Sequence, residues 1–169
     1  MKIVTTFLFL VVFGGSSLKA QNYQTHTLYI YSFGKFVIWP EEDKKGDFEI
    51  FILGDSPIIE ELKQMSEKKK VGDRVIKVAK INTLNDFKKG HILFIPSGQS
   101  GQLNDVLTKL GDRSTLVITE QPGLGVKGSD VNFVVKEGKL AFELNQNALS
   151  KHKLRAANEL TRLAIIIWK

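Results

Sequence analysis

The chain has 169 residues, of which 43% are hydrophobic and 25% are charged, and this balance is that of one ordinary globular domain. It contains no cysteine, which excludes disulfides and a cysteine-linked lipid anchor. The formal net charge of +6 falls to +4 once Lys2 and Lys19 are set aside with the first twenty residues, and so small an excess argues against a nucleic-acid-binding protein.

Residues 1–20 have the order of a secretory signal peptide. Lys2 precedes an apolar core over residues 4–13, small residues follow, and Ala20 is a suitable cleavage point. A membrane anchor is the weaker alternative, because the apolar core is well short of the roughly 20 residues that span a bilayer. We expect cleavage after Ala20, export to the periplasm, and a mature chain over residues 21–169 that forms a single domain with no membrane span.

The first half of the mature chain predicts a helix and then a strand–helix–strand unit. Crowded apolar residues over 23–39 favour a helix that stops at Pro40, since proline cannot donate an amide inside a helix. Its aromatic stripe has two interpretations, core packing or a partner surface. A buried strand over 48–53 leads to Ser56 and Pro57, which are suited to begin a helix over 58–68, and an alternating strand follows at 75–81. The short connections imply a parallel crossover.

The second half predicts another such unit and a hairpin. Strands at 91–95 and 116–118 flank a short helix at 102–110, and strands at 131–135 and 140–144 are joined by four residues with a glycine third. Asn145 is placed to cap a final helix over 145–168 that packs lengthwise on the sheet. The predicted fold is a three-layer α/β sandwich, with a mixed sheet of about six strands, flanking helices and a C-terminal β-hairpin plus helix.

The glycine-rich loop matches the spacing G-x-G-x-x-G through Gly123, Gly125 and Gly128. In a dinucleotide site the third glycine opens a helix, whereas Gly128 leads into a predicted strand, so we expect a tight loop and no cofactor. The turn at residues 96–101 lies between a strand and a helix, where α/β sheets bind anions. A periplasmic small-ligand-binding module that uses this turn is therefore an alternative function.

The titratable residues are not grouped as catalysis requires. The three histidines lack metal-ligand spacing, and no serine has the surroundings of a nucleophile elbow. We therefore expect no metal site, no catalytic residue and no enzymatic activity, with an envelope hydrolase as a second and weaker alternative.

Six segments in order carry a family resemblance: LYIYSFGKFVIWP (28–40), ILGDSP (52–57), VGDRVIKV (71–78), GHILFIP (90–96), LVITEQPGLGVKG (116–128) and VNFVVKEGKLAFELNQNAL (131–149). Together they resemble the YfiR-like family of exported proteins over residues 27–165. The resemblance implies an α/β fold without a catalytic centre and a periplasmic regulator that binds the outer-facing domain of an inner-membrane signalling protein. In that family the partner is best known as a diguanylate cyclase of cyclic-di-GMP signalling; a histidine kinase is the alternative partner, and a homodimer is also compatible.

The resemblance also implies where a partner would bind, and two departures limit what it implies. We expect the partner site to combine exposed members of the first helix and its end with the glycine loop, namely Tyr31, Lys35, Trp39, Gly123, Leu124, Gly125 and Gly128; the alternative for Trp39 is a place in the core. The best-studied family members carry cysteines, so their redox control does not extend to this chain. Their loop ends in paired glycines, whereas this loop ends in Gly128-Ser129-Asp130.

Overall fold

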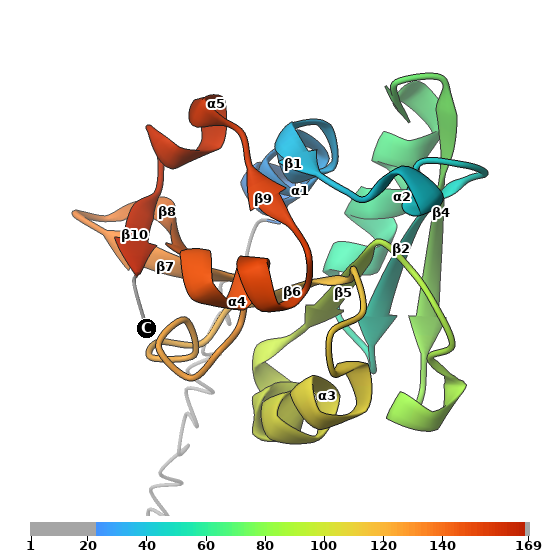
Figure 1. Ribbon diagram of the computed structural model, residues 1–169. Helices are drawn as coiled ribbons and strands as arrows, with labels where there is room; N and C mark the ends of the chain where they lie inside the picture. The colour runs from blue at the N-terminus through green and yellow to red at the C-terminus, as the bar shows by residue number, and fades with distance from the viewer. Residues whose placement is uncertain (1–22, 168–169) are drawn as a thin grey trace, which may run out of the picture.

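The computed structural model describes residues 23–167, so the predicted signal peptide at residues 1–20 lies outside the described residues (Figure 1). Helices and strands alternate along most of this range, as the periodicity of the sequence predicts. The α-helices are α1 (Gln24–Phe36), α2 (Ile58–Lys68), α3 (Leu103–Leu110), α4 (Gln146–Lys151) and α5 (Asn158–Thr161), and a 3-10 turn over Ser97–Gln102 precedes α3.

The strands form an eight-stranded mixed sheet and a separate two-stranded one, so the prediction of about six strands is too low. The order in the large sheet is β10-β8-β7-β6-β5-β2-β4-β3, and the neighbours from β4 through β7 are parallel, as predicted. The strands are β1 (Val37–Ile38), β2 (Phe48–Leu53), β3 (Lys70–Val71), β4 (Arg74–Ile81), β5 (Ile92–Ile95), β6 (Leu116–Thr119), β7 (Val131–Lys136), β8 (Lys139–Asn145), β9 (Arg155–Ala156) and β10 (Ile165–Ile167).

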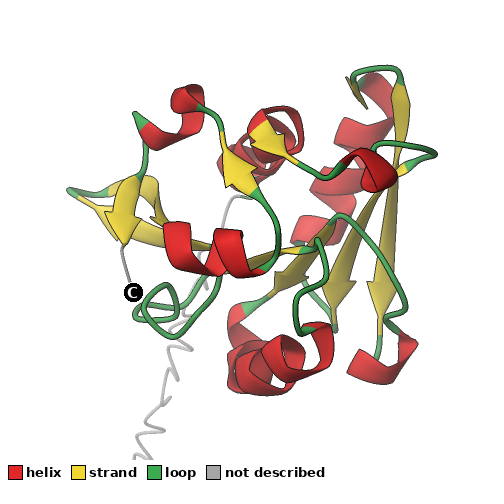
Figure 2. Cartoon of the chain, in the orientation of Figure 1, coloured by secondary structure: helices red, strands yellow, loops and turns green. Residues whose placement is uncertain are grey.

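Helices cover both faces of the sheet, which confirms the predicted mixed α/β architecture (Figure 2). The central strand β5 shows why: Ile92 and Phe94 enter the core beneath α1 and α2, while Leu93 and Ile95 enter the core beneath α3. Each of these four side chains is fully buried. A continuous apolar strand is therefore stable here because both of its faces are removed from water.

The hairpin β7–β8 pairs antiparallel as predicted, but its turn is tighter than the four residues expected. Lys136 pairs with Lys139, which leaves Glu137 and Gly138 as the only turn residues. Both have positive φ, +51° and +73°, which matches the twist of a two-residue hairpin turn. The extra pair lengthens both strands at the outer end of the hairpin.

The first predicted helix is too long at its C-terminal end. Helix α1 stops at Phe36, because Val37 and Ile38 pair antiparallel with Ala156 and Arg155 of β9. Pro40 therefore follows a short strand rather than the helix itself. The two-stranded sheet ties the end of α1 to the C-terminal part of the chain, as the adjacent β1 and β9 show in Figure 1.

The single C-terminal helix predicted over residues 145–168 is wrong. Asn145 does cap a helix, accepting a hydrogen bond from the Ala148 amide at 3.0 Å, but this helix, α4, ends after six residues. Lys153 then adopts φ +58°, and the Leu154 amide donates to the Leu149 carbonyl at 2.8 Å, a pattern that terminates a helix. The remaining residues form β9, α5 and β10, and β10 runs parallel to β8 at the edge of the sheet.

Candidate partner-binding surface

Tyr31 and Lys35 lie on the solvent side of α1, as the sequence predicts. Tyr31 is half-buried, and its hydroxyl donates to the Lys70 carbonyl at 3.3 Å, which ties it to β3. Lys35 is exposed, with its ammonium 5.7 Å from the centre of the Tyr31 ring and 5.4 Å from that of Phe36. Of the two residues, Lys35 is the better placed to meet another molecule.

Trp39 belongs to the core, so its prediction as a partner contact is wrong and the alternative is confirmed. Its side chain is 5% exposed and meets Phe48 edge-to-face, with ring centres 5.3 Å apart, and also His91 at 6.0 Å. Aromatic residues at helical spacing usually face the core, and burial against β2 shows that Trp39 does so.

Two residues of the glycine loop, Leu124 and Gly125, are buried, whereas Gly123, Val126 and Lys127 are exposed. Leu124 is 6% exposed and joins the core beneath α3, so it is not a surface contact as predicted. Gly125 is buried too, and a side chain there would collide with Glu143 and lie 2.8 Å from Ile167. Gly123 has φ +84° and Gly128 has φ +110°, conformations that favour glycine. Gly125 therefore permits the close packing of the loop against β8 and β10, and the positive φ angles of Gly123 and Gly128 permit the turns of its backbone.

The two halves of the predicted site lie toward opposite ends of the parallel strands. The Tyr23 hydroxyl, just before α1, donates to Glu120 at 3.1 Å, so the start of α1 lies beside the glycine loop. Gly34, near the other end of α1, lies against Phe48 at the start of β2. Lys35 is about 18 Å further along the helix axis than Tyr23 at 1.5 Å per residue. Tyr31 and Lys35 thus do not form one patch with the loop.

Glu120 occupies the position where the turn at residues 96–101 was expected to bind an anion. The Ser97 amide donates to Glu120 Oε1 at 2.9 Å, and the Ser97 hydroxyl lies 3.3 Å from the same oxygen. In the same turn, the Gln99 side chain packs against Gly54, beside the point where the strand order reverses between β2 and β5. The amide and hydroxyl of Ser97 are therefore already hydrogen-bonded to a side chain of the protein.

The contact with Glu120 makes Tyr23 a measurable reporter of how the start of α1 is docked. Burial, together with the Glu120 carboxylate, raises the pKa of Tyr23 to about 12. Because this value exceeds that of the unfolded chain, near 10, the stabilisation is present below about pH 10 and is lost as the pH rises towards 12. We expect a late phenolate step in an absorbance titration, and Glu120→Gln should move it to lower pH. A titration curve unchanged by Tyr23→Phe would contradict this assignment.

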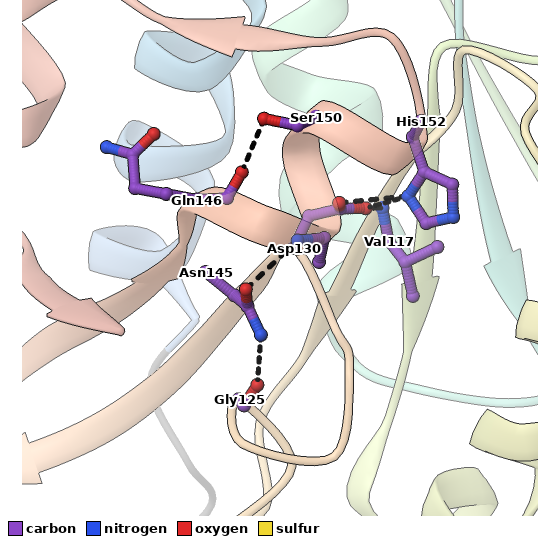
Figure 3. Close-up of polar contacts among 8 residues, drawn as sticks. Val117, Gly125, Asp130, Asn145, Gln146, Ser150 and His152 are labelled. Carbon is purple, nitrogen blue, oxygen red and sulfur yellow. Dashed lines mark hydrogen bonds and ion pairs between the residues drawn. The ribbon is translucent and has the colours of Figure 1, made fainter. Parts of the chain in front are cut away.

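Asp130 and His152 form a fully buried pair beneath the glycine loop (Figure 3). Both carboxylate oxygens of Asp130 lie 2.9 Å from His152 Nδ1, and Oδ2 also accepts the Val117 amide at 2.7 Å. Burial raises the pKa of the Asp130 carboxyl, and the hydrogen bonds from His152 and Val117 oppose this shift. The pair joins the end of the loop, β6 and the end of α4.

An open groove with apolar walls lies between the start of α1, the loop and the hairpin. It encloses about 370 Å³ and is lined by His26, Glu120, Pro122, Phe133, Val134, Val135 and Leu140. Val135 is 76% exposed, the largest exposed fraction among the large apolar residues described. None of the residues predicted for the partner site lines this groove, although the place of Val135 next to the polar end of the hairpin was a signal that it faces solvent.

The described residues hold no arrangement that indicates a metal site or a membrane span. No group of three or more His, Cys, Asp or Glu side chains within residues 23–167 is placed to bind a metal ion. None of the helices in that range is long and apolar enough to cross a bilayer. His91 has a structural place, since its Nδ1 accepts the Glu49 amide at 3.0 Å and Nε2 donates to the Asp43 carbonyl at 2.8 Å. Burial lowers the pKa of His91, which favours the neutral ring.

The comparisons with known proteins point to one family. A model of the YfiR/HmsC-like family matches residues 23–165, which is almost the whole described range. No curated protein matches the chain significantly.

Proposed function

Because the chain belongs to the YfiR/HmsC-like family, we propose that it is a non-catalytic periplasmic regulator that binds the periplasmic domain of an inner-membrane signalling protein and controls its output. The family match over residues 23–165 is the observation that carries this proposal. The partner class is a membrane diguanylate cyclase, and a histidine kinase is the alternative outcome of the tests below. Export by the first twenty residues belongs to the same proposal.

The polar groups of the structure support a binding role over a hydrolytic one. Glu120 Oε1 accepts hydrogen bonds from Tyr23 and Ser97, and the buried Asp130 carboxylate is paired with His152. Glu143 accepts a hydrogen bond from Asn132 at 2.8 Å. These side chains fix the loop to the sheet, which is what a rigid recognition surface requires.

The groove beside the loop is the surface we assign to the partner. Apolar side chains gathered in a groove, with a carboxylate at the edge, suit an apolar or aromatic side chain as the anchor of an interface. Regulation further requires that this protein binds the partner's two conformational states with different affinity. A difference in binding free energy of about 5.5 kcal/mol would move the equilibrium between those states from 1:99 to 99:1. With no cysteine in the chain, this control does not use a disulfide of its own.

Val135→Asp is expected to weaken binding of the partner's periplasmic domain at least about tenfold, because burying a charge in an apolar contact costs more than 1.4 kcal/mol. The matched control is Val75→Asp, since Val75 is also an exposed strand valine, 42% exposed, on β4 near the other edge of the sheet. Both variants should keep the thermal midpoint of the native protein within a few degrees, as exposed positions do. Binding is measured by calorimetry with the isolated periplasmic domain.

The two arms of this experiment give different answers. Loss of binding in Val135→Asp with native binding in Val75→Asp supports the groove. Equal binding by both folded variants would contradict the groove as the binding surface, and absence of binding by the native protein to any co-encoded membrane sensor would contradict the regulatory function itself.

A further inference from the structure

A second cavity lies on the other side of the glycine loop, between the loop, α3 and α4. It encloses about 340 Å³, and its walls include Leu107 and Val126 on the apolar side and Lys127, Asn147, Lys151 and His152 on the polar side. Lys127 and Lys151 are exposed at its rim, whereas His152 is fully buried in its wall. The cavity has no carboxylate among its lining residues, so its charge is positive.

The His152 ring is held in one orientation by a contact of one ring nitrogen, and the other ring nitrogen has no such contact among the described residues. Nδ1 is engaged by Asp130, and the opposite side of the ring faces away from that carboxylate (Figure 3). His152 Nε2 is buried and has no hydrogen-bond partner among the described residues. Since a buried polar atom without a partner costs about 1–3 kcal/mol, this nitrogen indicates a group that the protein alone does not supply.

The other polar residue deep in the cavity is already satisfied. Asn145 donates to the Gly125 carbonyl at 2.9 Å and accepts from the Ala148 amide at 3.0 Å, so both its side-chain nitrogen and its side-chain oxygen already have a hydrogen-bond partner. The remaining side-chain donors at the cavity are the Lys127 and Lys151 ammonium groups, the Asn147 amide and an N–H on His152 Nε2. Two ammonium groups and neutral donors around a small cavity match the oxygens of an anion.

We propose that this cavity binds a small organic or inorganic anion through a carboxylate or phosphate group, with His152 Nε2–H donating from the wall and Lys127 and Lys151 contacting it at the rim. Asp130 positions the ring and balances its positive charge, in the way that a carboxylate orients a histidine ligand. The site does not depend on the proposed partner, and its test uses the exported protein alone, so the two proposals fail separately.

Other charged groups lie around this cavity. They are Asp130 behind the ring, Lys127 on the loop, Lys151 on α4, and the Lys153–Asp112 ion pair that follows α4, with Nζ and Oδ2 2.7 Å apart.

The test is a titration of the uniformly ¹⁵N-labelled mature protein with inorganic phosphate and, in a separate arm, with acetate, followed through the imidazole nitrogens by NMR. The expected result is a saturable shift of His152 Nε2 with at least one of the two anions, while the His26 and His91 resonances stay in place. Phosphate binding alone assigns the site to phosphate groups, acetate binding alone to carboxylates.

Variants at the rim separate a built site from weak surface attraction. Lys127→Gln combined with Lys151→Gln should weaken binding at least about tenfold without unfolding the protein, because both lysines are exposed. Lys136→Gln, which removes an exposed lysine at the outer end of the hairpin, should leave binding unchanged. No saturable His152 shift with either anion, or equal binding by the double variant and the native protein, would overturn the proposal.

Discussion

Replacing His152 with leucine is expected to lower the free energy of unfolding by about 3–5 kcal/mol, because it leaves the Asp130 carboxylate buried without its partner. The Val117 amide still donates to Asp130, but one hydrogen bond does not replace an ion pair. The loop end, β6 and the end of α4 meet at this pair, so its loss should loosen all three together. Urea denaturation of the native protein and the variant measures the difference.

A double substitution tests whether the loss comes from the unpaired charge. Asp130→Asn combined with His152→Leu removes both charges, so it should be less destabilising than the sum of the two single changes. The loss of unfolding free energy caused by His152→Leu should also become smaller as the pH falls to about 4. The reason is that burial raises the pKa of Asp130, and the protonated carboxyl needs no counter-charge. If the two single changes in unfolding free energy simply add up in the double variant, or if the loss in His152→Leu does not depend on pH, the pair contributes through packing alone.

Trp39→Ala is expected to cost about 3–5 kcal/mol of unfolding free energy, as truncation of a large buried aromatic residue does. The indole packs on Phe48 and His91, and its removal would leave a cavity between β2 and the chain that follows α1. The expected fall in thermal midpoint is several degrees or more. Differential scanning calorimetry and denaturant titration measure both quantities.

Trp39→Phe is the matched control. The indole Nε1 is buried without an acceptor among the described residues, so phenylalanine loses packing volume but no hydrogen bond, and the cost should be clearly smaller. A folded Trp39→Ala protein of near-native stability that has lost its partner would contradict the core assignment and return Trp39 to the interface.

The sequence predicts the centre of the fold because the central strands carry apolar residues on both faces. Strands β5 and β6 are continuous apolar runs, and the alternation in β7 and β8 predicts the hairpin. The short strands β1, β3, β9 and β10 have two or three residues each, too few for any period to be read. Their pairing depends on contacts between distant parts of the chain.

The C-terminal helix was predicted wrongly because leucines spaced along residues 149–160 imitate a helical face. Leu149, Leu154 and Leu160 are indeed all buried, but in two short helices and the turn between them. The buried His152 and the positive φ of Lys153 interrupt the helix, and a lysine in that conformation has no sequence signature. The three isoleucines of β10 favour a strand over a helix, which local propensity could have indicated.

The candidate site was harder to predict than the fold. Tyr31 and Lys35 are on the surface as expected, whereas Trp39 and Leu124 proved to be core residues, because an aromatic or aliphatic side chain at a segment end is compatible with either place. The Asp130–His152 pair joins residues 22 positions apart in different elements, so only the tertiary structure brings them together. The departure at Gly128-Ser129-Asp130 marked the position without revealing its partner.

The most direct test of the regulatory account is the signalling output of the full-length membrane partner, reconstituted in vesicles with its periplasmic domain accessible. Cyclase or kinase activity is measured as the mature protein is added, beside Val135→Asp and Val75→Asp as matched variants. We predict a saturable change in output with the native protein and Val75→Asp, and at least about tenfold more Val135→Asp for the same change. An output that stays constant while the native protein is bound would contradict the account.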